Sequence, residues 1–148
     1  MARSILAVIA GYVLFALFIF VAFTALYLVL GADASFKPGS YHPSNLWLAL
    51  STLLGFIGTV VGGYVCAALA RGGRAPLALA VVVLVVGLLF AFLAPKRSEG
   101  SEVRAGNVPN LEAMQKAIQP RWSALLNPFL GAAGVLVGGR LRRQPAAG

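Results

Sequence analysis

Four long runs of this chain contain no charged side chain, and shorter polar segments separate them. The runs cover residues 4–30, 45–70, 75–94 and 122–139. A helix needs about 20 mostly apolar residues to cross a hydrocarbon core of about 30 Å, and each run approaches or exceeds that length. The pattern predicts an all-α integral membrane four-helix bundle, in which a single transmembrane domain covers residues 1–148.

Helices are expected rather than barrel strands, because backbone polar groups in lipid must be satisfied within their own segment. Barrel strands alternate apolar and polar residues over about ten positions, whereas residues 81–86 read Val-Val-Val-Leu-Val-Val. Arg3 could begin a signal peptide, but the apolar core of such a peptide has only about 7–15 residues. The first run is much longer, so it is predicted to be a span.

The composition supports the same class. Hydrophobic residues make up 59% of the 148 positions and charged residues 11%, and the mean hydropathy is +0.87. A soluble domain carries about 25% charged residues, with which it covers its surface. The surface of this chain must therefore meet the lipid bilayer.

Four spans place both termini on one side of the membrane. That side carries six basic residues in short segments without an acid, whereas the other side has six basic residues and all four acids in two longer loops. Orientation follows the Lys/Arg bias near span ends, and the higher density favours cytoplasmic termini in the cell (inner) membrane. The net charge of +8 forms no basic stripe with interleaved aromatics. We therefore expect contacts with lipid headgroups and no nucleic-acid partner.

A glycine pattern occurs twice, 76 positions apart. Residues 55–63 and residues 131–139 both read GxxGxxVGG. The same offset pairs Ser51 with Asn127. The chain is therefore expected to contain two duplicated helical hairpins in parallel orientation, related by an axis along the membrane normal. Chance resemblance between glycine-rich spans is the alternative.

Small residues line one face of the second and fourth spans. Association in lipid depends on close backbone approach, and spacings of three and four positions place side chains on one helical face. The two stripes consist of Ser51, Gly55, Gly58, Gly62 and Cys66, and of Ser123, Asn127, Gly131, Gly134 and Gly138. We expect these faces to meet at the centre. The bulkier first and third spans suit lipid, another membrane subunit or self-association.

The two loops opposite the termini contain local structure. Lys37-Pro38-Gly39-Ser40 has Pro and Gly at the central positions of a turn, and Ser44 is the expected N-cap of the second span. Residues 110–119 between two prolines are predicted to form a short interfacial helix, with Leu111, Met114 and Ile118 on one face and a Glu112–Lys116 pair on the other. Covering a pocket is the alternative role for this helix.

Few residues suggest chemistry. Intramembrane ionisable residues mark proton and ion pathways, and the four runs contain none. His42 and Cys66 are single residues that this topology places near opposite faces, so we expect no metal site, no cofactor and no catalytic residues. The strongest polar feature is Asn127 before Pro128, which removes a helical hydrogen bond.

Two interpretations of Asn127 follow. The first is an interhelical hydrogen bond to Ser51 or Thr52. The second is a small polar pocket formed by Asn127 and Ser51 and bounded by Trp47 and Trp122.

The sequence favours a small multi-pass membrane protein that acts as a non-enzymatic accessory or structural subunit within the bilayer. The alternative is a small carrier, channel or lipid-binding protein with its pocket near Asn127. An enzyme would depend on the loop carboxylates Glu99, Glu102 and Glu112, whose spacing matches no catalytic arrangement.

Overall fold

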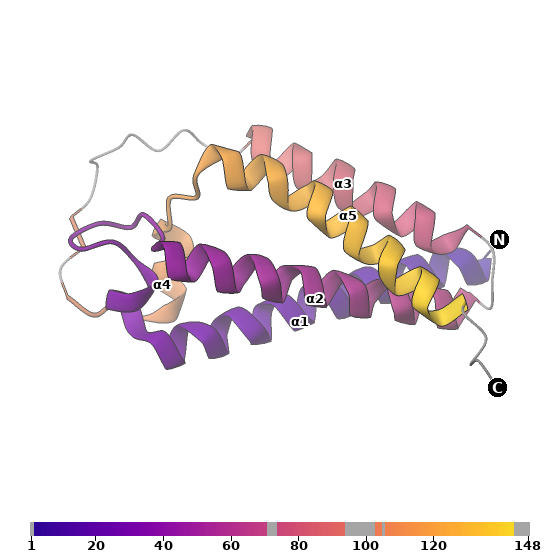
Figure 1. Cartoon of the computed structure of the whole chain (residues 1–148), viewed down its shortest axis with the longest axis horizontal. Coiled ribbons are helices and arrows are strands. Elements are labelled where there is room, and N and C mark those ends of the chain that lie inside the picture. Colours follow the sequence, from indigo (N-terminus) through magenta and orange to yellow (C-terminus); the bar gives the residue numbers. More distant parts are fainter. Residues whose placement is uncertain (1, 71–73, 94–102, 105, 144–148) are drawn as a thin grey trace.

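The computed structural model describes residues 2–70, 74–93, 103, 104 and 106–143 of the chain. In this part the chain forms a helical bundle (Figure 1). The helices are α1 (Ala2–Ser35), α2 (Asn45–Ala70), α3 (Ala75–Leu93), α4 (Asn110–Lys116) and α5 (Arg121–Arg143). All except α4 are long and apolar enough to cross a membrane. The all-α fold class is therefore confirmed, and the four long helices suit the predicted spans in length and composition. The acids Glu99 and Glu102 fall outside the described residues, and so does most of the segment between the second and third uncharged runs.

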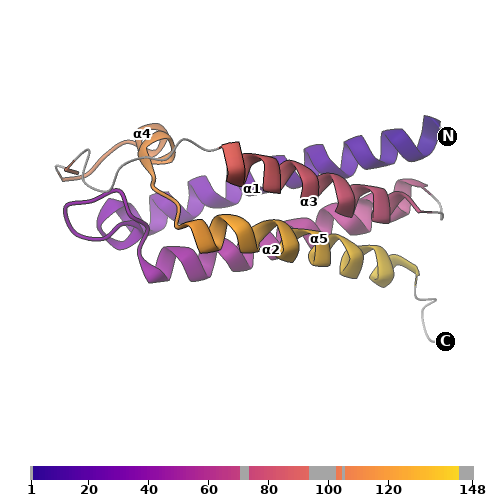
Figure 2. The same cartoon turned by 90° about the horizontal axis from the view of Figure 1, so that it is seen from above.

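The four long helices lie in the order α1, α2, α5, α3. The most extensive contact joins α2 to α5, α1 packs on α2, and α3 packs on α5. The start of α1 and the end of α5 lie at one end of the bundle, which we call the terminal end (Figures 1 and 2). The opposite end, which we call the cap, consists of residues 36–44, 103–104 and 106–120. Because α2 and α5 both begin beside the cap, these two central helices run parallel.

The apolar core lies toward the terminal end. Its buried residues come from all four long helices and are Ala7, Cys66, Ala75, Leu79, Ala80, Val83 and Val135. There α1 lies beside α3, and Gly11 faces Leu79. Toward the cap the two helices separate in the view of Figure 1. The bundle is therefore closed most tightly at its terminal end.

Glycines allow the backbones to approach closely. A Cβ on Gly62 of α2 would lie 2.9 Å from the carbonyl oxygen of Gly11 in α1, and a Cβ on Gly138 of α5 would lie 2.8 Å from the backbone nitrogen of Tyr64 in α2. Real Cβ atoms do not approach other atoms this closely. In lipid, where helices attract each other only weakly, such close approach provides the packing energy.

The stripe of small residues on α2 has a different partner from the one expected. Gly58 lies against Phe18, and Gly62 against Gly11 and Phe15, so this stripe packs on α1 rather than on α5. The next face of α2, which includes Thr59 and Gly63, contacts α5 instead. The stripe on α5 also divides. Gly134 and Gly138 face α2, and Gly131 lies against Val83 of α3 as well as Thr59.

The repeated pattern agrees only partly with a twofold arrangement. Gly134 lies against Thr59, Gly138 against Val60 and Val135 against Gly63. The separations of 75, 78 and 72 positions bracket the repeat offset of 76, so equivalent residues lie at similar depth. However, Gly58 faces its own hairpin partner, whereas the equivalent Gly134 faces the other hairpin. The duplication stays a prediction.

Candidate functional site

The cap begins where α1 bends. Gly31 has a φ of 71°, a conformation that favours glycine, and the chain then completes one more turn to Ser35. Beyond it, Ser40 N donates to Lys37 O at 3.2 Å, and Gly39 has a φ of 65°. The predicted turn over residues 37–40 is therefore present.

Ser44 ends the first loop in two ways. Its Oγ accepts a hydrogen bond from Trp47 N at 3.1 Å, which is the expected N-cap of α2. The same hydroxyl donates to Ala34 O at 2.5 Å. The start of α2 is thereby fixed to the end of α1.

An aromatic cluster fills the space beneath this loop. Tyr27 lies edge-on to Phe36 and to Trp47, and Phe36 lies edge-on to Tyr41, with centroid separations of 5.8–6.4 Å. Tyr27, Phe36 and Tyr41 are each at most 5% exposed. Edge-to-face pairs of this kind stabilise a cluster beyond the area that they bury. These rings therefore form a second core of the molecule, beneath the first loop.

Long-range polar contacts join the second loop to the first. The Arg104 guanidinium binds Asp33 Oδ1 at 2.7 Å and also donates to Gly106 O, while Arg104 N donates to Gly39 O at 3.2 Å. The Arg104 side chain is only 4% exposed, whereas Asp33 is 90% exposed. Arg104 therefore acts as a buried crosslink between two segments about 70 positions apart.

The short helix α4 is fixed to α1 by three contacts. Tyr27 Oη donates to Val108 O at 2.6 Å, Asn110 Nδ2 donates to Thr24 Oγ1 at 3.2 Å, and Ala113 is buried against the aromatic cluster. Leu111 and Met114, which were predicted to share the apolar face of an interfacial helix, are both exposed. Ala113 and Asn110 face α1 instead, since only a small side chain permits such a close approach.

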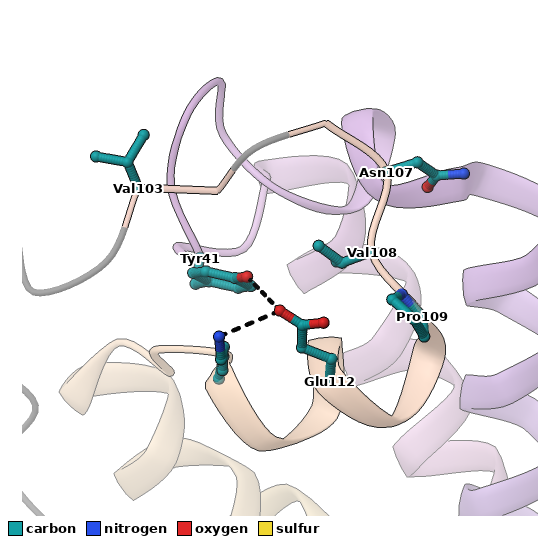
Figure 3. A pocket seen from close by; sticks show the side chains of 7 residues that line it. Tyr41, Val103, Asn107, Val108, Pro109 and Glu112 are labelled. Atoms are coloured by element: carbon teal, nitrogen blue, oxygen red, sulfur yellow. Dashed lines mark hydrogen bonds and ion pairs between the residues drawn. The ribbon is translucent and has the colours of Figure 1, made fainter.

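A pocket of about 480 Å³ opens beside α4 (Figure 3). Its lining residues are Tyr41, Val103, Asn107, Val108, Pro109, Glu112 and Lys116. Tyr41 Oη donates to Glu112 Oε1 at 3.0 Å, and Lys116 Nζ lies 3.2 Å from the same oxygen. The Lys116 ammonium also lies 5.6 Å from the centroid of the Tyr41 ring. The predicted Glu112–Lys116 pair is therefore part of a three-residue cluster.

The electrostatics of this cluster keep Glu112 ionised. Hydrogen bonds from Lys116 and then from Tyr41 hold the pKa of Glu112 below its ordinary value of 4.5. A carboxylate that accepts two hydrogen bonds is stabilised in its charged form. The pocket thus presents a fixed negative group and a fixed positive group side by side.

Among the described residues, no hydrogen bond or ring contact joins the residues predicted to form a pocket around Asn127. Ser51 Oγ donates to Leu48 O of its own helix at 3.3 Å, and among the described residues no hydrogen bond joins Ser51 to Asn127. Trp47 packs on Phe23 and Tyr27, whereas Trp122 is exposed. The neighbouring Pro128 lies against Gly87, where a Cβ would be 2.8 Å from the proline ring. The Asn127 segment therefore serves the contact between α5 and α3.

Two further candidates from the sequence lie apart. His42 lies in the first loop, where its backbone nitrogen donates to Ser40 Oγ at 3.1 Å. Cys66 is a free, buried thiol between α1 and α3 in the core. Within the described ranges, no three His, Cys, Asp or Glu side chains group together as a metal site would require.

Sequence reasoning missed Tyr27, Asp33 and Arg104 as site residues. Their contacts span 71 to 81 positions, so no local pattern connects them. Two local signals did exist, namely an acid two positions after Gly31 at the end of the first apolar run, and a tyrosine near the end of that run. No known protein family, curated protein or solved structure matches the chain.

Proposed function

We propose that this chain is a non-enzymatic accessory or structural subunit that packs within the cell (inner) membrane, with both termini in the cytoplasm. The observation that supports this most is the character of the bundle interior. In the described helices, charged side chains occur only at the ends, and glycine-to-backbone contacts close the space between α2 and α5. Carriers and pumps place ionisable groups along an internal path, and such a path has no counterpart here.

The outward faces of α1 and α3 support packing against other apolar surfaces. Phe20 on α1 and Val85, Phe90 and Phe92 on α3 are all exposed. These faces suit acyl chains and apolar helices alike. The test of a subunit role must therefore distinguish a protein neighbour from lipid.

A photo-reactive amino acid placed at Val85 or Phe20 in native membranes makes that distinction. We expect at least one site to crosslink to a single different membrane protein, which also co-purifies in fixed stoichiometry in mild detergent. The control is the same probe at Val135, which is 1% exposed and should crosslink only within the chain. A monomeric chain whose exposed probes label lipid alone would contradict the proposal, as would measurable turnover or solute uptake.

The proposed orientation has its own test. Because Cys66 is fully buried, membrane-impermeant maleimide should label only introduced cysteines. We expect Ser40→Cys in the first loop to react from outside intact cells, and Arg140→Cys to react only after permeabilisation. The reverse pattern would place the termini outside.

A lipid-binding role is the second candidate. The observation that favours it is the pocket beside α4, whose volume lies in the range typical of small-molecule sites. Its polar groups are the starting point for a more specific inference.

A further inference from the structure

The pocket beside α4 lies at the level of the membrane surface. The first residue of α4, Asn110, is hydrogen-bonded to Thr24, which lies six positions before the end of the apolar run of α1. At a rise of 1.5 Å per residue, this contact is roughly 9 Å inside the run. Helix α4 therefore lies beside the apolar part of α1, where lipid headgroups meet acyl chains.

The exposed side of α4 fits that location. Leu111 is 67% exposed and Met114 is 48% exposed, although both are large apolar side chains. A short helix at a membrane interface directs such residues toward the acyl chains and its polar residues toward the headgroups. Glu112 and Lys116, which line the pocket, are then at headgroup depth.

The pocket cluster has one saturated and one open oxygen. Both the Tyr41 hydroxyl and the Lys116 ammonium contact Oε1 of Glu112, as the two dashed lines in Figure 3 show. Among the described residues, no hydrogen bond or ion pair ends on Oε2 of Glu112. This carboxylate can therefore accept a further hydrogen bond without losing those that it already makes.

We propose that this pocket binds the headgroup of a zwitterionic phospholipid that carries a primary ammonium, with Glu112 Oε2 accepting from the ammonium and Lys116 contacting the phosphate. A ligand with a single charge would compete with one partner of the Glu112–Lys116 pair and repel the other. A zwitterion places each of its charges beside the opposite charge of the pair. The adjacent carboxylate and ammonium thus favour a headgroup that carries both charges at separate positions.

The same geometry distinguishes the ammonium type. A primary ammonium carries N–H donors, and hydrogen bonds between two charged groups are about twice as strong as neutral ones. A quaternary ammonium has no donor and would need an aromatic face. The face of Tyr41 is already approached by Lys116 at 5.6 Å. Phosphatidylethanolamine therefore fits better than phosphatidylcholine.

Native mass spectrometry of the full chain in an uncharged detergent tests the proposal. The probes are phosphatidylethanolamine, phosphatidylcholine and phosphatidylglycerol with identical acyl chains. We expect one phosphatidylethanolamine to bind about tenfold more tightly than either other lipid, which is the effect of one charge-assisted hydrogen bond. Equal affinity for the three lipids would overturn the proposal.

Variants assign the effect to the cluster. Glu112→Gln keeps an acceptor for Tyr41 but removes the charge, and it should abolish the preference for phosphatidylethanolamine over phosphatidylcholine. Lys116→Gln should weaken both of these lipids, because both carry the phosphate. The matched control is Lys37→Gln, which removes an exposed cation of the cap outside the pocket and should change nothing. If Glu112→Gln is unstable, Lys116→Gln still decides, since unchanged binding of both lipids in that variant would contradict the proposal.

A soluble competitor separates the lipid from other sources of the same headgroup. Glycerophosphoethanolamine has the same charges but no acyl chains to contact Leu111 and Met114. We expect it to compete at least about a hundredfold more weakly than the lipid, because the apolar contacts are lost. Competition at equal concentration would mean that the pocket takes a soluble zwitterion and not a lipid. Neither result bears on whether the chain associates with another subunit.

Discussion

The half of the bundle nearer the terminal end, which we call the terminal half, is held together by different interactions from those in the cap. In the terminal half, Gly11, Gly62 and Gly138 let backbones touch, and the surrounding core residues are apolar. In the cap, the crosslinks are an ion pair at Arg104, hydrogen bonds from Tyr27 and Tyr41, and edge-on rings. The first set needs small residues, and the second needs long polar or aromatic ones.

The surroundings of each part explain this difference. Lipid is as apolar as the helices, so helices in lipid associate by shape and close contact. At the membrane surface water competes for polar groups, and only contacts that are buried or cooperative persist. The two parts share only α1 and the first turns of α2 and α5. We therefore expect them to lose structure separately, as distinct cooperative units.

The largest effect should come from filling a glycine contact in the terminal half. In Gly138→Ala, the new Cβ would lie 2.8 Å from Tyr64 N, so α2 and α5 must move apart. Overpacking of this kind costs about 3 kcal/mol. The measurement is the free energy of unfolding in detergent micelles. The matched control is Gly55→Ala, where the nearest atom is 4.0 Å away, and equal losses in both variants would refute this packing scheme.

The next effect should come from the ion pair of the cap. Arg104→Ala removes the crosslink to Asp33 and Gly106, and we expect it to destabilise the cap by about 2 kcal/mol, as for a hydrogen bond to a charged group. Asp33 is left solvated, so no buried charge adds to this cost. The rate of backbone amide hydrogen exchange should rise at α4 and in the first loop but not in the core around Leu79. Faster exchange in both regions would show that the two parts unfold as one unit. Arg142→Ala, an exposed residue at the terminal end, is the control.

A smaller effect is expected from Tyr27→Phe. This change removes the 2.6 Å hydrogen bond to Val108 O but keeps the ring in its cluster. A net loss of about 1 kcal/mol is typical for one neutral hydrogen bond. Thermal unfolding followed by Trp47 fluorescence checks this value, because Trp47 packs on Tyr27. Tyr12→Phe serves as the control at the terminal end, and a larger loss there would reverse the comparison.

The smallest effect should be the pH dependence of the cap. The pKa of Glu112 is lower in the folded chain than its ordinary value of 4.5, so its contribution to stability is present above that value. This contribution is lost as the pH falls through the folded-state pKa. The Trp47 signal should therefore show constant stability from pH 7 to about pH 5 and a decline at lower pH. Glu112→Gln should remove that part of the decline, and an unaltered profile would contradict this assignment.

The sequence predicted local features well. The bounds of α2, the turn at residues 37–40 and the N-cap at Ser44 all depend on residues within a few positions of one another. The length of an uncharged run is also a local property, which is why the sequence predicted the four long apolar helices. Each of these features follows from the chemistry of one segment.

Contacts between segments that are distant in the sequence were predicted less well. A stripe such as Gly58 and Gly62 identifies a face that permits close approach, but it does not identify the helix that packs on that face. In this protein that helix is α1. Leu111 and Met114 are exposed, as an interfacial helix allows, but the contact of Ala113 with the aromatic cluster was not predicted. Arg104 and Asp33 are joined only in the folded chain, so no spacing rule could pair them.

The unequal lengths of α1 and α3 affect the surrounding bilayer. The straight part of α1 before Gly31 is about 43 Å long, and α3, with 19 residues, is about 28 Å long. Near the end of α1 that leads into the cap, Leu28 and Val29 are 72% and 83% exposed. Lipid on that flank must thicken, or the protein must tilt, to cover these side chains, whereas α3 suits an ordinary bilayer. We therefore expect the protein to impose a gradient of thickness across its own width and to prefer regions where the membrane already changes in depth.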